Sequence, residues 1–299
     1  MRAAQAVSPV SPRSPGGAGF RLADALGLGS RRGRWLWAMG ACLAVFAAVP
    51  VLAWLLGDAG LEPDLLARNQ PPSLHHLFGT DTLGRDMFSR TVHGLMLSLR
   101  VGLLAAAASS ILALVLGVAS ASLGRAADGV VSWLVDIFMT VPHMVLLILI
   151  SFAVGGGARG VVIAVALTHW PALTRVIRAE VLQLRGALYV RTARRFGKGP
   201  LAVAATHMLP HLLPQFCIGL ILLFPHAILH EAALSFLGVG LSPHTPAVGI
   251  LLAESMRHLS TGYWWLGILP GAALLCLVKC FDILGYNLDR LLDPKTSQE

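Results

Sequence analysis

Two histidines in one apolar stretch are the residues of this sequence best suited to bind a metal ion. His226 and His230 lie within residues 212–241, and Glu231 follows them. On a helix, residues four apart share a face with their Cβ atoms about 6 Å apart, so both rings can offer nitrogens to one borderline divalent cation. Glu231 lies about 100° round the helix from His230 and is expected to pair with another segment. Hydrogen bonding of the two rings between helices, gating and proton transfer remain open as other roles.

A second group of charged residues lies between two long apolar stretches. Residues 78–90 read Phe-Gly-Thr-Asp-Thr-Leu-Gly-Arg-Asp-Met-Phe-Ser-Arg. We expect the two aspartates to pair with the two arginines and to order a turn ahead of the helix that follows. The residues that define this motif are Gly79, Asp81, Gly84, Arg85, Asp86 and Arg90.

A third candidate is the basic segment of residues 188–210. It is expected to form a helix at residues 188–196, a break at Gly197 and a second short helix at residues 201–208. Such an element can dock on a partner protein, although a basic loop held near anionic lipid has the same composition. No G-x-x-x-x-G-K-[ST] run occurs in the chain, so we expect no phosphate-binding loop and no ATP hydrolysis by the chain itself.

The elements that position these residues are predicted to be membrane helices. Of the 299 residues, 56% are hydrophobic and 13% are charged, which is too apolar for a soluble protein of this length. The sequence therefore predicts an all-α integral membrane protein with six transmembrane helices. Pro142 is expected to kink the third span, and the short fourth span must borrow flanking residues. The predicted spans are residues 35–57, 101–124, 129–154, 161–174, 212–241 and 262–278.

The net charge of +8 does not indicate a nucleic-acid partner, because the Lys and Arg residues are distributed along the chain as the predicted membrane topology requires. With the N-terminus inside and six alternating spans, 17 of the 23 Lys and Arg residues fall inside and 6 fall outside. This asymmetry predicts that both termini are cytoplasmic. Residues 1–34 contain several arginines among Ser, Pro, Gly and Ala, so we expect a disordered basic tail there.

The motifs resemble those of a known family of transport proteins. Residues 79–90 closely resemble the GTDxLGRDxxSR signature of the permease subunits of ATP-binding cassette (ABC) importers for dipeptides, oligopeptides and nickel. Residues 235–240, Ser-Phe-Leu-Gly-Val-Gly, are similar to a segment of the same permeases. The basic segment resembles the cytoplasmic EAA loop by which such permeases dock on their ATPase. The coupling residues implied by this resemblance are Tyr189, Arg191, Ala193, Gly197, Leu209 and Pro210.

The resemblance implies the ABC importer permease fold in the bacterial inner membrane. The implied partners are a second homologous permease subunit, two ATPase subunits that use the ATP, a periplasmic solute-binding protein and the lipid bilayer. No cofactor is expected on this chain. The expected organisation is a cytoplasmic tail at 1–34, a first transmembrane helix at 35–57, a periplasmic segment at 58–98, a permease core of five transmembrane helices at 99–285 and a cytoplasmic tail at 286–299.

Two positions of the basic segment depart from the family pattern. Arg191 stands where the family usually has a glutamate, and His207 stands where it usually has an apolar residue. We therefore expect an acidic cleft on the partner ATPase. In the segment before the last span, Ala247 and Val248 replace the usual acidic-aromatic pair, so the contact with the binding protein is expected to differ too.

The histidines favour nickel, free or chelated, as the cargo, and make the nickel permease C-type subunit the nearest resemblance. His226 and His230 are similar to a His-x-x-x-His of nickel permeases, and His169 lies in a Thr-His-Trp run similar to their Ser-His-Trp. A translocation path must release its cargo, so contacts from His226 and His230 are expected to be transient. His143 and His169 are expected to be neutral and hydrogen-bonded between helices. Import of dipeptides or oligopeptides is the alternative, and a membrane metalloenzyme, for which H-E-x-x-H is missing, is a remote one.

Overall fold

The computed structural model describes residues 31–242 and 245–292, so most of the predicted 1–34 tail lies outside the described residues. The described part is helical apart from turns, loops and one isolated β-bridge between Thr80 and Asp86, which confirms the predicted all-α fold. The α-helices are α2 (Arg31–Leu56), α3 (Met87–Ser122), α4 (Arg125–Thr140), α5 (His143–Ala153), α6 (Gly157–Gly186), α7 (Leu188–Arg195), α8 (Pro200–Val203), α9 (Leu209–Phe236), α10 (Val248–Met256) and α11 (Trp265–Leu292). Single 3₁₀ turns occur at Leu65–Ala67 and Leu259–Thr261, and a π-helical turn at Ala204–Met208.

Five helices are each long and apolar enough to cross a bilayer. They are α2, α3, α6, α9 with its preceding π-helical turn, and α11. Helices α4 and α5 pass the same test only together, and they are bent by 100° relative to each other. The described residues thus contain five continuous candidate spans, and six if α4 and α5 together make one broken span, at the places where the sequence predicts six.

The predicted third span, residues 129–154, is corrected from one kinked helix to two helices. Helix α4 ends at Thr140, and Val141 has an extended backbone with φ −78° and ψ 135°. The ring of a proline disfavours the helical conformation of the residue before it, and Pro142 has no backbone N–H to continue the helix. The chain therefore turns at residues 141–142 and a new helix begins at His143.

Three helices extend well beyond the predicted spans. Helix α3 begins at Met87, ahead of the predicted start at residue 101, and so includes residues 87–98 of the predicted periplasmic segment. Residues 161–174, expected as a short span, lie within the 30 residues of α6. Helix α11 runs to Leu292 and includes residues 286–292 of the predicted tail. A charge-free window underestimates helix length because charged residues near helix ends keep their charged groups in water. In contrast, α9 ends earlier than expected, at Phe236, since Gly238 has a positive φ of 78°.

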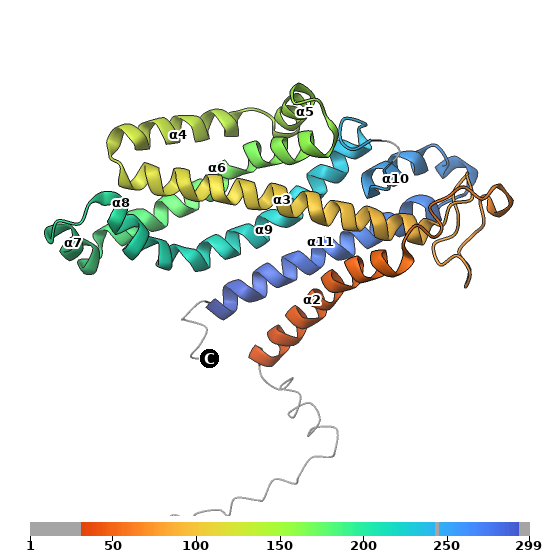
Figure 1. The fold of residues 1–299 in the computed structure, drawn as a ribbon, viewed down its shortest axis with the longest axis horizontal. Helices are drawn as coiled ribbons and strands as arrows, with labels where there is room; N and C mark the ends of the chain where they lie inside the picture. The colour runs from red at the N-terminus through yellow and green to blue at the C-terminus, as the bar shows by residue number, and fades with distance from the viewer. Residues whose placement is uncertain (1–30, 243–244, 293–299) are drawn as a thin grey trace, which may run out of the picture.

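Small residues on α3 allow α6 and α9 to approach it closely. A Cβ on Gly117 would lie 2.8 Å from Ile177 of α6, and a Cβ on Gly102 would lie 2.8 Å from Ile228 of α9. Ala105, also on α3, is fully buried. Close approach of this kind is the main source of helix association in a bilayer, where lipid is as apolar as the side chains. Helix α3 is therefore the centre of the bundle, and α2 packs against α11 at its side (Figure 1).

The candidate sites lie at different levels of this bundle. Figure 1 shows α7 and α8 at one end, and α10 with the segment that precedes α3 at the opposite end. The turn between α4 and α5 lies along the length of the bundle, beside α6. The basic segment and the charged motif are thus separated by the whole length of the spanning helices.

Candidate functional site

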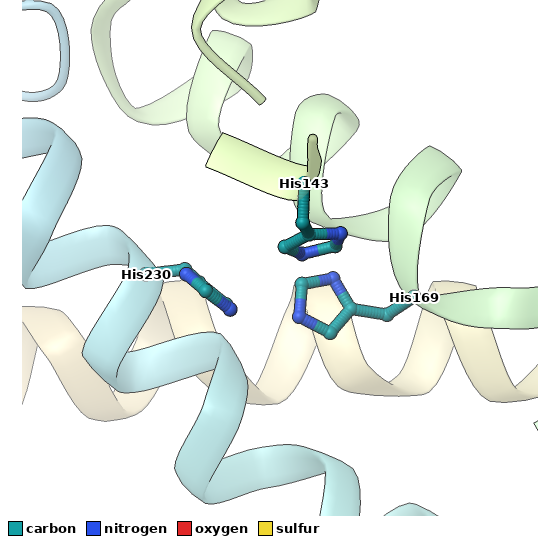
Figure 2. Close-up of side chains that lie close together, drawn as sticks. All are labelled: His143, His169 and His230. Atoms are coloured by element: carbon teal, nitrogen blue, oxygen red, sulfur yellow. The ribbon is translucent and has the colours of Figure 1, made fainter. Parts of the chain in front are cut away.

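Three histidines from three different helices converge beside the turn between α4 and α5. His143 is the first residue of α5, His169 lies on α6 and His230 lies on α9, and their rings face one another (Figure 2). One possible ligand nitrogen of each ring lies within 4.8 Å of those of the other two. The ring centroids are 4.5 to 4.9 Å apart, and all three residues are half-buried. Three neutral imidazoles at such distances can share one metal ion.

This cluster, which we call the histidine trio, only partly matches the pair predicted from sequence. His230 is a member, whereas His226, one turn earlier on α9, is exposed and is not part of the group of ligand atoms. His143 and His169, predicted as hydrogen-bonded rings, are the two other members. Nδ1 of His169 lies 3.0 Å from the carbonyl oxygen of Val165 on its own helix, while Nε2 of His143 is buried with no hydrogen-bond partner.

Glu231 points away from the trio and into the contact between α9 and α3. Its side chain is fully buried, and its Oε2 accepts a 2.5 Å hydrogen bond from the hydroxyl of Ser98 on α3. Its Oε1 accepts a 2.9 Å bond from the hydroxyl of Ser235. The prediction that Glu231 pairs with another segment is correct, and its partners are hydroxyl groups that sequence reasoning missed.

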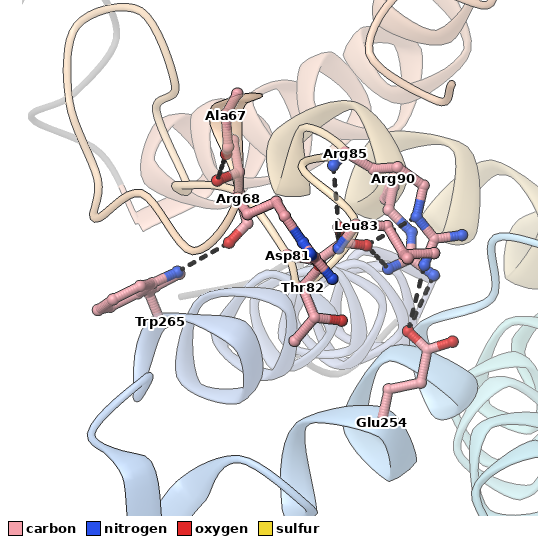
Figure 3. Close-up of polar contacts among 10 residues, drawn as sticks. Ala67, Arg68, Asp81, Thr82, Leu83, Arg85, Arg90, Glu254 and Trp265 are labelled. Carbon is pink, nitrogen blue, oxygen red and sulfur yellow. Dashed lines mark hydrogen bonds and ion pairs between the residues drawn. The ribbon is translucent and has the colours of Figure 1, made fainter. Parts of the chain in front are cut away.

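The charged motif before α3 forms an ion network at one end of the bundle (Figure 3). The carboxylate of Asp81 accepts 2.7 Å bonds from the guanidinium groups of Arg85 and Arg90. The same carboxylate accepts bonds from the backbone N–H groups of Leu83 and Arg85, at 2.8 and 2.9 Å. Arg90 also donates a 3.0 Å bond to Glu254 on α10, a pairing that sequence reasoning did not predict. Asp81 thus holds the turn together and, through Arg90, joins it to α10.

Asp86 has a role different from the predicted pairing with arginine. Its carboxylate accepts a 2.8 Å bond from the backbone N–H of Ser89 and so caps the first turn of α3. Its other oxygen lies 2.9 Å from Nδ1 of His76. The motif glycine Gly84 has a φ of 78°, and a Cβ there would lie 1.6 Å from the carbonyl oxygen of Asp64. Only glycine fits at this position.

The basic segment forms α7, a turn at Gly197 with a φ of 83°, the short helix α8 and the π-helical turn that leads into α9. Among the predicted coupling residues Ala193 is buried, whereas five are exposed: Tyr189, Arg191, Gly197, Leu209 and Pro210. Two large apolar side chains that the sequence did not single out are also exposed, Leu188 at 80% and Phe196 at 83%. An apolar and basic surface of this kind is typical of a contact with another protein.

Comparison with known proteins gives a consistent result. The sequence profile of a family described as "Binding-protein-dependent transport system inner membrane component" matches residues 113–295. A Brucella abortus protein named as a peptide transport system permease is 35% identical over 257 residues, 86% of each chain. A Brucella suis protein named as a peptide permease is 36% identical over 252 residues, 84% of this chain and 83% of the relative. The dipeptide transport system permease protein DppC of Bacillus subtilis is 29% identical over 253 residues, 85% of this chain and 79% of the relative.

Proposed function

Because this chain belongs to the family of binding-protein-dependent transport system inner membrane components, a family of ABC importer permeases, we propose that it carries peptides across the inner membrane. The observation that carries this proposal is the similarity to relatives named as peptide permeases over 84 to 86% of the chain. The comparisons favour the peptide alternative over the nickel cargo that the histidines alone indicated. They give no support to a membrane metalloenzyme.

Nickel, free or chelated, is the second candidate cargo. The observation that favours it is the histidine trio, because ionisable residues are costly within a bilayer and usually face a cavity or a partner. Imidazole nitrogen is a suitable ligand for Ni²⁺. His226 is exposed on the same helix and remains a possible transient contact for cargo, as the sequence suggests.

We propose the partners of an ABC importer for this permease. A second, homologous permease subunit completes the path, two ATPase subunits use the ATP, and a periplasmic binding protein delivers the cargo. The two termini and the α7–α8 end face the cytoplasm, in agreement with the excess of basic residues there. The transporter alternates between an inward-open and an outward-open state. ATP and the binding protein each shift this equilibrium, because each binds the two states with unequal affinity.

The proposed ATPase contact is the exposed surface of α7 and the turn that follows it. Leu188 and Phe196 supply apolar area, and Arg191 supplies positive charge beside them. A hollow of about 520 Å³ at this end is lined by side chains of α7, including Leu188 and Arg191. This arrangement fits insertion of α7 into a cleft with acidic residues.

Uptake by cells that carry the complete transport system tests the cargo. We expect accumulation of a labelled dipeptide that is lost when this chain is deleted and when the partner ATPase is inactivated. Radioactive nickel is measured in the same cells. Nickel uptake that depends on this chain, without dipeptide uptake, would replace peptides by nickel. Failure of both substrates to depend on the chain would contradict both proposals.

A further inference from the structure

We propose that His143, His169 and His230 form a binding site for one borderline divalent cation, such as Zn²⁺, Co²⁺ or Ni²⁺. The three imidazoles supply three ligands, and the fourth position is open to water or to an anion. The site does not depend on which cargo the permease carries. Its residues differ from the predicted pair on α9, because two of the three ligands come from α5 and α6.

The first support is geometry. The three ligand nitrogens lie within 4.8 Å of one another. Around a tetrahedral ion with metal–nitrogen bonds of about 2.0 to 2.1 Å, neighbouring nitrogens lie about 3.3 Å apart. Small rotations about the side-chain bonds would close this difference, and all three residues are only half-buried. Figure 2 shows the three rings turned toward a common point, with their backbones on three separate helices.

The second support is the availability of the nitrogens. Nδ1 of His169 lies 3.0 Å from the carbonyl oxygen of Val165, so this nitrogen carries the proton and donates it to the carbonyl. The lone pair of Nε2 is then available, which is the arrangement by which metal-bound histidines are usually oriented. Nε2 of His143 is buried with no hydrogen-bond partner, and a buried polar atom without a partner is costly. A bound cation satisfies that atom.

The third support is the space beside the trio. A cavity of about 430 Å³ is lined by His143 and His169, together with residues from the end of α4 and from α6. Its volume exceeds what one or two water molecules need, so there is room for water as the fourth ligand beside His143 and His169, although His230 does not line this cavity. Glu231 does not supply that ligand, because both of its oxygens accept hydrogen bonds from serines at the α3 contact.

The consequence of binding is a link between α5, α6 and α9. Helix α5 follows the 100° turn and is joined to the bundle chiefly through α6. A cation held by one residue from each helix fixes α5 relative to both neighbours. Imidazole ligands select borderline transition metals, whereas Mg²⁺ and Ca²⁺ prefer oxygen.

The full chain, purified in lipid nanodiscs without a histidine tag and stripped with a chelator, is titrated with Co²⁺. We expect one equivalent to bind with the visible absorption of four-coordinate cobalt, and Mg²⁺ not to compete. Since loss of a supporting partner alone weakens metal sites about 10- to 100-fold, His143→Ala, His169→Ala and His230→Ala should each weaken binding by at least about tenfold. The triple variant should lose it.

His211→Ala is the matched control, because it removes an exposed histidine of the same helix, 19 residues before His230, and should leave binding unchanged. His143→Cys tests ligation apart from folding: it should keep one equivalent and add a thiolate-to-cobalt charge-transfer band. Zn²⁺ should raise the unfolding temperature of the wild type and not that of the triple variant. Undiminished binding by the triple variant, or equal loss in His211→Ala, would overturn the proposal.

Discussion

Replacing Asp81 by asparagine should destabilise the protein far more than the same change at Asp136. Both aspartates pair with arginines, at 2.7 Å for Asp81 with Arg90 and at 2.8 Å for Asp136 with Arg175. The substitution keeps the shape of each side chain, removes its charge and replaces one acceptor oxygen by an NH2 donor. At Asp81 the amide oxygen can still accept the backbone N–H bonds that form the turn, so the change isolates the ion pairs.

The difference in magnitude follows from burial. Arg90 is only 3% exposed, and removing one partner of a buried ion pair costs about 3 to 5 kcal/mol because the other charge stays buried. Glu254 still accepts a bond from Arg90 at 3.0 Å, so we expect a loss of about 3 kcal/mol, at the lower end of that range. The side chains of Asp136 and Arg175 are 67% and 53% exposed, and such a pair contributes about 0 to 1 kcal/mol.

The assay is denaturant unfolding of both variants and the wild type in the same detergent, followed by circular dichroism and by tryptophan fluorescence. Trp265 donates a 3.3 Å hydrogen bond to the carbonyl oxygen of Thr80, so the fluorescence includes a reporter beside the motif. The free energies of unfolding are compared from the midpoints and slopes. A loss for Asp81→Asn no larger than that for Asp136→Asn would refute the argument that burial makes this network stabilising.

Three further changes test other contacts. Glu231→Ala should lower the free energy of unfolding by about 1 to 3 kcal/mol, because two buried serine hydroxyls lose their acceptor. Glu231→Gln keeps an acceptor oxygen and should cost less, so an equal loss in the two variants would contradict this reason. Gly84→Ala should lower the midpoint temperature of unfolding more than Gly124→Ala. Both glycines have a positive φ, so the backbone strain is shared. A Cβ at Gly84 would lie 1.6 Å from the carbonyl oxygen of Asp64, whereas a Cβ at Gly124 would meet open space. Equal shifts of the two midpoints would refute the steric reason. Arg191→Glu should weaken co-purification with the partner ATPase by at least about tenfold, with Arg191→Lys as the control, and unchanged binding would exclude an acidic cleft.

Features that depend on neighbouring residues in the sequence were predictable. The apolar stretches correspond to helices because span length and composition are local properties. The motif before α3 was recognisable because its members lie within residues 79–90, and Asp81 does pair with Arg85 and Arg90. The helix ends were less predictable, since charged residues that stop a hydropathy window need not stop a helix.

Features that depend on the packing of distant segments were not predictable. The members of the histidine trio are at positions 143, 169 and 230, and no local spacing indicates that they meet. The four-residue spacing of His226 and His230 placed both on one helix without showing which of them faces the bundle. Glu254 likewise joins the network from a separate helix, 164 residues beyond Arg90.

The turn at residues 141–142 explains how the trio can form at all. Phe138, before the turn, packs against Trp170 of α6 with ring centroids 5.4 Å apart. His143, after the turn, faces His169, the adjacent residue of α6, at 4.5 Å. The chain therefore wraps round one turn of α6, and the residues on either side of the break contact successive α6 side chains. A helix continued straight through Pro142 would carry its next residues along the axis of α4 and away from this turn of α6. The break that sequence reasoning treated as a kink is thus the feature that brings the third imidazole to the other two, and motion of α5 relative to α6 and α9 would change the distances between the rings.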